Sequence, residues 1–90
     1  MQTLKNDILT VLVSEMGAEL QSIVKNGYEY LWQGDPAFWG RRSPVLFPIV
    51  GSVWEKKYRV DGKEYEMGQH GFARDMKFEF VSATDSEVWY

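Results

Sequence analysis

Apolar and polar residues alternate with a period close to two along most of the chain, and this alternation strongly constrains the fold. Residues 8–13, 19–24 and 28–32 are rich in β-branched, apolar and aromatic side chains and are separated by short turn-forming stretches. A period of two matches the side-chain repeat of a β-strand rather than the 3.6-residue repeat of a helix. The chain is therefore predicted to be all-β, with these three segments forming an antiparallel meander.

Two dipeptides predict tight hairpins. Asn26-Gly27 lies between the second and third of these strands, and Asp61-Gly62 lies between residues 57–60 and 63–67. Both dipeptides tolerate the positive φ angles of a two-residue hairpin turn. Along the second hairpin we expect one face to carry the apolar and aromatic positions, which are Tyr58, Val60, Tyr65 and Met67.

The last part of the chain predicts further strands. Residues 76–80 alternate cleanly, so we expect Phe78 and Phe80 to be buried on one face of a strand. Residues 83–86 are expected to turn, and residues 87–90 to begin one more strand. That strand would present an open, aromatic sheet edge. We therefore expect residues 1–90 to be the N-terminal portion of one larger antiparallel β-sandwich domain.

The middle of the chain has a different composition. Residues 37–44 are aromatic, basic and broken by glycine, whereas residues 45–51 are almost wholly apolar. Two prolines, Pro44 and Pro48, exclude a helix interior and a central strand. We expect an extended segment that plugs the core, with Arg41 and Arg42 at its entrance.

Composition removes several classes of function. The 90 residues include no cysteine and one histidine, which disfavours a disulfide framework, thiolate chemistry and a zinc site. The net charge is −3 and the basic residues form no run longer than a pair, which argues against a nucleic-acid partner. The apolar run 45–50 is too short to cross a membrane, and residues 1–5 lack a signal-peptide pattern. We expect a cytoplasmic protein whose oligomeric state the sequence leaves open.

The stretch Gln69-His70-Gly71-Phe72-Ala73-Arg74 is the strongest candidate for a functional site. A histidine donates or accepts protons near neutral pH, and an arginine offers a fork of donors suited to hydroxyl or phosphate oxygens. Gly71 allows backbone conformations that let both side chains face one cleft.

Four motifs in this order resemble the opening of the aldose 1-epimerase (galactose mutarotase-like) family. They are Gly-Ala-Glu-Leu-Gln-Ser-Ile at 17–23, Tyr-Leu-Trp-Gln-Gly at 30–34, Arg-Ser-Pro-Val-Leu-Phe-Pro-Ile-Val-Gly at 42–51 and His-Gly-Phe-Ala-Arg-Asp at 70–75. The resemblance is strongest to the bacterial branch of LacX-like and hexose-6-phosphate epimerase-like proteins. It implies a large galactose mutarotase-like β-sandwich that binds a sugar on its concave face, in a protein about three times as long as this chain.

The same resemblance implies the interconversion of α and β anomers of a hexose or hexose phosphate, without a metal or organic cofactor. A carboxylate removes the proton of the anomeric hydroxyl while a histidine protonates the ring oxygen. His70 matches the first family histidine, a catalytic residue near the ring oxygen, and Arg74 matches a substrate or phosphate ligand. Arg41 or Arg42 lies near an earlier substrate arginine, although Gly-Arg-Arg-Ser-Pro departs from the usual Arg-Gly-Gly-Ile-Pro.

The general base and the second histidine of the family have no counterpart here, so these 90 residues cannot catalyse the reaction alone. Two other functions stay open: a carbohydrate-binding β-sandwich without chemistry, and an autonomous small structural β-domain. The aromatic residues suited to stack on a sugar are Trp32, Trp39, Phe47 and Trp54.

Overall fold

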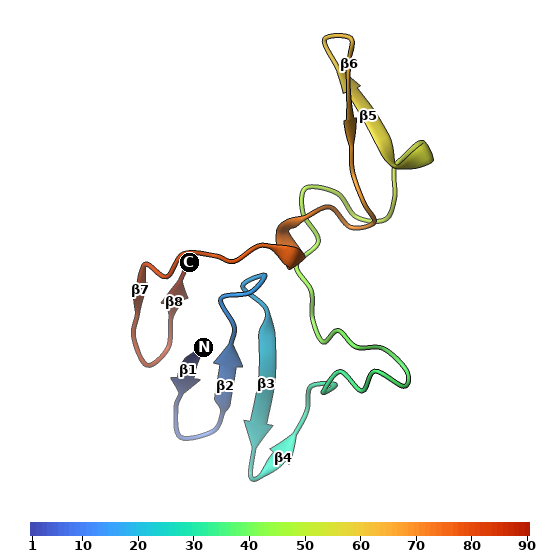
Figure 1. Ribbon diagram of the computed structural model, residues 1–90. Coiled ribbons are helices and arrows are strands. Elements are labelled where there is room, and N and C mark those ends of the chain that lie inside the picture. The colour runs from blue at the N-terminus through green and yellow to red at the C-terminus, as the bar shows by residue number, and fades with distance from the viewer.

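The computed structural model describes residues 1–90 and contains strands, two 3-10 turns and no α-helix (Figure 1), which confirms the all-β prediction. The elements are β1 (Gln2–Lys5), β2 (Thr10–Val13), β3 (Leu20–Lys25), β4 (Tyr28–Glu29), η1 (Trp54–Lys56), β5 (Lys57–Val60), β6 (Lys63–Glu66), η2 (Ala73–Asp75), β7 (Ser82–Ala83) and β8 (Val88–Trp89). Every strand pair is antiparallel. The structure contains no helix with the length and apolarity that a membrane crossing requires.

The first four strands form one sheet in the order β1-β2-β3-β4. β2 and β3 pair in register up to a bulge between Leu12 and Val13. β1 was not expected, because Leu4 is the only large apolar residue within it. It becomes a strand because all four of its residues, from Gln2 to Lys5, pair with β2.

Both predicted hairpin turns are confirmed. Asn26 and Gly27 have φ angles of 51° and 74°, and Asp61 and Gly62 have φ angles of 50° and 77°. These are the left-handed conformations that a two-residue hairpin requires. The turn chemistry is therefore sufficient to set the register of β3 with β4 and of β5 with β6.

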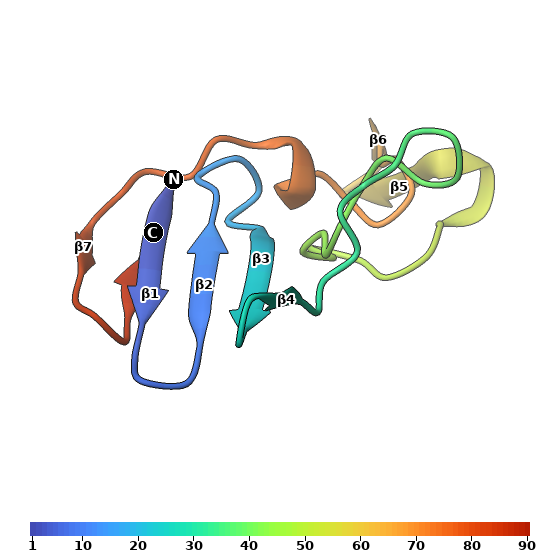
Figure 2. The same cartoon turned by 90° about the horizontal axis from the view of Figure 1, so that it is seen from below.

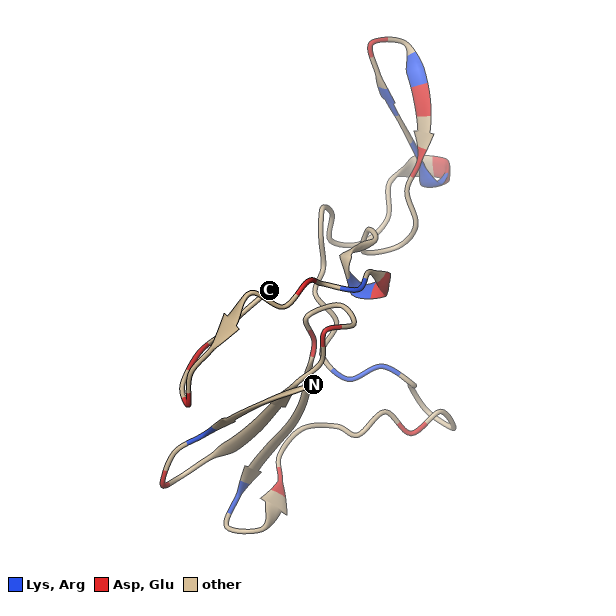
Figure 3. Ribbon diagram, turned by 60° about the vertical axis from the view of Figure 1, so that its left-hand side comes forward, with Lys and Arg blue, Asp and Glu red and all other residues tan.

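The β5–β6 hairpin stands away from the four-stranded sheet, and basic and acidic residues are interspersed along it (Figures 1 and 3). Tyr58 and Tyr65 are cross-strand partners whose rings stack with centroids 5.3 Å apart. The expected shared face therefore exists at this pair. All residues of the two strands are nevertheless exposed, so the hairpin is held by its own cross-strand contacts.

The prediction of a strand at residues 76–80 is wrong. The segment makes one isolated bridge, between Met16 and Lys77, and Phe80 is 49% exposed rather than buried. Alternation describes two faces, but a strand also needs a paired strand. Here the backbone meets only the turn around Glu15, whose carbonyl accepts a hydrogen bond from the Phe78 N–H at 2.7 Å. The expected turn at 83–86 is shifted by one residue, since Ala83 belongs to β7, which pairs with β8.

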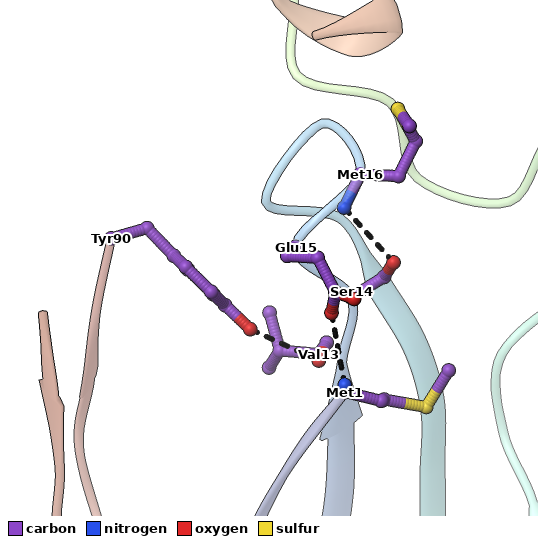
Figure 4. Close-up of polar contacts among 6 residues, drawn as sticks. All are labelled: Met1, Val13, Ser14, Glu15, Met16 and Tyr90. Atoms are coloured by element: carbon purple, nitrogen blue, oxygen red, sulfur yellow. Dashed lines mark hydrogen bonds and ion pairs between the residues drawn. The ribbon is translucent and has the colours of Figure 1, made fainter. Parts of the chain in front are cut away.

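The β7–β8 hairpin lies beside the β1 end of the sheet (Figure 2). The Lys5 N–H donates to the Asp85 carbonyl at 2.8 Å, and the Tyr90 hydroxyl donates to the Val13 carbonyl at 3.3 Å (Figure 4). The Met1 amino group lies 2.9 Å from the Glu15 carboxylate and lowers its pKa. Burial raises the pKa of the Tyr90 hydroxyl. The Lys5–Asp85 and Tyr90–Val13 hydrogen bonds hold the C-terminal hairpin against the start of the chain.

Little of the apolar surface is buried. Seven of the 90 residues are buried, and the apolar ones among them are Val13, Met67 and Ala73. The radius of gyration is 16.3 Å, against about 12 Å for a compact chain of this length. Large side chains such as Phe38 and Trp54, which are 82% and 86% exposed, therefore have no core around them.

We predict that residues 1–90 expressed alone associate through these exposed faces and strand edges. Size-exclusion chromatography should give oligomers or aggregates, with strong binding of a hydrophobic dye. A clean monomer with a sharp, cooperative unfolding transition would contradict this prediction.

One carboxylate organises the outer half of the sheet. Glu29 accepts hydrogen bonds from the Ser22 hydroxyl, from the Ile23 N–H at 2.8 Å and from the Leu31 N–H at 3.1 Å. The Ser22 hydroxyl, followed by these N–H groups, favours the charged form and holds the pKa of Glu29 below its ordinary value of 4.5. The charged carboxylate therefore ties β3 to β4 and to Leu31, two residues beyond the end of β4.

A lowered carboxyl pKa stabilises the folded state above the unfolded pKa, and this contribution is lost as pH falls through the folded pKa. In the intact protein, we predict that stability falls as the pH drops below 4.5 and that this slope is smaller in Glu29→Gln. Denaturant unfolding at several acidic pH values measures both. Glu79→Gln, at an exposed carboxyl, is the control, and equal slopes in the two variants would sink the role given to Glu29.

Candidate functional site

The candidate site forms where the apolar segment 44–51 runs beside residues 68–73. The Phe47 carbonyl accepts hydrogen bonds from the Phe72 N–H at 3.0 Å and the Ala73 N–H at 3.2 Å, and Phe47 forms a parallel bridge with Gly71. Segment 44–51 does not plug a core in these 90 residues, because Phe47 and Val50 are 58% and 77% exposed. It contacts the His-Gly-Phe-Ala-Arg stretch through the backbone of Phe47 and Gly51.

Two glycines allow the close approaches that fix η2. Gly71 has a φ of 73°, and a Cβ atom there would collide with the Phe47 carbonyl. Gly17 has a φ of 70°, and its Cβ would lie 2.7 Å from the Arg74 carbonyl oxygen. The Gly17 N–H also donates to the Met76 carbonyl at 2.7 Å. η2 is thus held between segment 44–51 and the β2–β3 turn.

His70 is fixed by two hydrogen bonds to one residue. Its backbone N–H donates to the Gly51 carbonyl at 2.7 Å, and its ring Nδ1 accepts a hydrogen bond from the Gly51 backbone N–H at 2.8 Å. The φ of His70 is 61°, a conformation that costs energy in a residue other than glycine. The paired bonds to Gly51 offset that cost and orient the imidazole.

Arg74 is the more enclosed of the two candidate ligands in this stretch. Its side chain is 18% exposed, and its Nε is buried without a hydrogen-bond partner. The nearest carboxylate oxygen, on Asp75, is 3.9 Å away and too far for a hydrogen bond. Asp75 instead pairs with Arg41 at 2.9 Å. The positive charge of Arg74 is therefore weakly compensated within the chain.

His70 and Arg74 open onto one hollow of about 370 Å³, called here the His70 hollow. Its lining residues are Trp39, Pro44, Leu46, Gln69, His70 and Arg74. The structure thus brings together the histidine and one of the three candidate arginines. The candidate stretch in the sequence already includes Gln69, whereas no sequence pattern indicated Leu46 as a lining residue.

Arg41 and Arg42 do not line the His70 hollow. The guanidinium of Arg42 donates to the Gln21 carbonyl at 2.7 Å and to the Gln33 side chain at 2.9 Å, so it joins the loop to β3. Arg41 reaches the site indirectly through its ion pair with Asp75. No group of three or more potential metal-binding side chains gathers in the structure.

Residues 1–89 match the protein-family model described as aldose 1-epimerase. The chain belongs to the aldose 1-epimerase family. It is 39% identical to the protein LacX, chromosomal, of Lactococcus lactis subsp. lactis over 94 aligned positions, which cover 97% of the chain and 31% of LacX. The chain therefore spans about a third of the length of the curated relatives that it matches.

Solved structures agree with this assignment. A galactose mutarotase related enzyme from Lactobacillus acidophilus is 43% identical with a TM-score of 0.94, covering 97% of this chain and 30% of that one. A galactose mutarotase-like protein from Lactobacillus casei is 46% identical with a TM-score of 0.91, covering 98% of this chain and 31% of that one. The chain has the galactose mutarotase-like β-fold over the portion that it spans.

Within this aldose 1-epimerase fold, one of the four aromatic candidates lines the His70 hollow. Trp39 lines the His70 hollow, and its carbonyl accepts a hydrogen bond from the Trp32 indole N–H at 2.8 Å. Phe47 contributes its carbonyl to the Gly71 contact, and Trp54 lies at the start of the separate β5–β6 hairpin. Trp39 is therefore the aromatic residue placed to contact a ligand in the hollow.

We predict that Gly71→Ala destabilises the intact protein more than Gly27→Ala does. Both glycines have nearly the same positive φ, 73° and 74°, but a Cβ at Gly27 meets nothing within 4 Å. The shared backbone strain costs about 1 kcal/mol, so the excess for Gly71 reports the collision with Phe47. Thermal unfolding measures this excess, and equal destabilisation by the two substitutions would contradict it.

Proposed function

We propose that residues 1–90 are the N-terminal portion of a single mutarotase-like β-sandwich domain in a longer cytoplasmic protein. That protein would bind a hexose or hexose phosphate and interconvert its α and β anomers. The observation that carries the proposal is the convergence of His70, Arg74 and Trp39 on one hollow in a chain of the aldose 1-epimerase family. The span of about a third of the relatives' length supports the larger domain.

The reaction needs both a base and a proton donor. A base removes the proton of the anomeric hydroxyl, the bond between C1 and the ring oxygen breaks, and the ring oxygen gains a proton. Rotation about the C1–C2 bond and closure then give the other anomer. We propose that residues beyond these 90 supply both the general base and the group that protonates the ring oxygen, while His70 and Arg74 hold the sugar. No metal or organic cofactor enters this scheme.

Among the three arginines, we propose Arg74 as the direct substrate ligand. Arg74 lines the His70 hollow, and its nearest carboxylate oxygen is 3.9 Å away, so a phosphate or hydroxyl oxygen in the hollow would meet a guanidinium charge that the chain compensates only weakly. Arg41 would act on the site through Asp75, since that ion pair leaves it outside the hollow. Arg42, with its bonds to Gln21 and Gln33, would support the loop that carries Trp39.

The test uses the full-length protein and mutarotation of a hexose and its 6-phosphate followed by polarimetry. If Arg74 grips phosphate, Arg74→Ala should raise KM for the hexose phosphate much more than for the free hexose. A lost charge-assisted hydrogen bond corresponds to roughly ten- to 150-fold. Arg59→Ala, on the separate hairpin, is the control for lost charge.

Equal losses for both substrates would remove the phosphate assignment and leave Arg74 as a hydroxyl ligand or a structural residue. Sugar binding without any acceleration of mutarotation would favour the alternative of a carbohydrate-binding module that has no chemistry.

A further inference from the structure

The hydrogen bonds of His70 determine where its ring hydrogen lies. Nδ1 accepts from the Gly51 N–H at 2.8 Å. A ring nitrogen that accepts a hydrogen bond carries no hydrogen, so the neutral imidazole must carry its hydrogen on Nε2. A hydrogen on Nδ1 would point at the hydrogen of the Gly51 N–H. Both groups would then be donors, and the hydrogen bond between them would be lost.

Gly51 is held for this role by its own geometry. Its carbonyl accepts a hydrogen bond from the backbone N–H of His70 at 2.7 Å, so the two residues are joined by a reciprocal pair of hydrogen bonds. The φ of Gly51 is 83°, in the left-handed region that glycine enters without strain. The backbone of Gly51, rather than a carboxylate, thus sets the tautomer of the histidine.

We infer that His70 presents a neutral Nε2–H to the ligand as a hydrogen-bond donor, and that Gly51 is the positioning residue that imposes this tautomer. This inference rests on the proposed function for the identity of the ligand. Nε2 makes no hydrogen bond within the chain, and His70 lines the hollow together with Arg74. The ligand therefore meets two donors from these side chains.

The consequence is a division of chemical roles. An Nε2–H cannot remove a proton, and a guanidinium has no acceptor. The oxygens that lie against His70 and Arg74 must therefore accept hydrogen bonds, as a ring oxygen, a hydroxyl lone pair or a phosphate oxygen does. The anomeric hydroxyl, which gives up its proton in the proposed reaction, must face a different group.

The first test is nitrogen NMR of the full-length protein labelled with ¹⁵N-histidine, at alkaline pH where imidazole is neutral. The His70 signals, assigned by their loss in His70→Asn, should show a protonated Nε2 and an unprotonated Nδ1. A hydrogen on Nδ1 overturns the inference whatever the protein binds. This spectrum needs no ligand, so its outcome is independent of the proposed function.

The second test compares His70→Gln with His70→Asn in NMR titrations with D-galactose and D-glucose. A glutamine amide can place an N–H where Nε2 lies, whereas an asparagine oxygen can accept the Gly51 N–H in place of Nδ1 but offers no donor at the ligand. Asparagine also tolerates the positive φ of 61°. We expect His70→Asn to bind a hexose roughly two- to tenfold more weakly than His70→Gln.

Equal or reversed affinities would overturn the donor role. Failure of the unmodified protein to bind either hexose, combined with a protonated Nε2, would instead contradict the proposed function and leave the tautomer assignment in place.

Discussion

The contact between the Phe47 carbonyl and the backbone at Gly71 is the constraint on which the site depends. One carbonyl oxygen accepts the N–H groups of Phe72 and Ala73, and the approach is so close that any side chain at residue 71 would collide with it. Because this contact begins η2, it also sets the position of Arg74. The neighbouring Gly51–His70 pair then fixes the imidazole on the same side. Two segments about twenty residues apart thus build the His70 hollow through backbone hydrogen bonds.

The local hydrogen bonding of the site contrasts with its sparse packing. Hydrogen bonds between backbone groups contribute about 0.5–1.5 kcal/mol each in net terms, whereas folding energy comes chiefly from buried apolar surface. Few residues are buried here, and most large side chains of segment 44–51 are exposed. The site geometry therefore needs further apolar contacts to persist in solution. Residues beyond these 90 would supply them in the larger domain proposed above.

Sequence reasoning succeeded where the cause of the structure is local. Asn26-Gly27 and Asp61-Gly62 fixed two hairpins because a turn depends on two residues. It failed where the cause is distant: β1 exists because β2 lies beside it, and residues 76–80 are not a strand because they bridge to a turn at a single residue pair, Met16 and Lys77, rather than to a strand. Family resemblance found His70 and Arg74, but the direction of the Arg42 side chain depends on Gln21 and Gln33, which no local pattern reveals.

The charges around the hollow explain why Arg74, rather than its neighbours, is available to a ligand. Asp75 lies next to it in the chain, yet this carboxylate makes its 2.9 Å contact with Arg41 and stays 3.9 Å from Arg74. Asp75 is also 60% exposed, and ion pairs at exposed positions contribute little because water screens them. The Arg74 guanidinium, in contrast, is largely enclosed, where a hydrogen-bond partner matters more. An oxygen-bearing ligand in the His70 hollow would thus gain most of its electrostatic stabilisation from Arg74, while His70 contributes direction rather than charge.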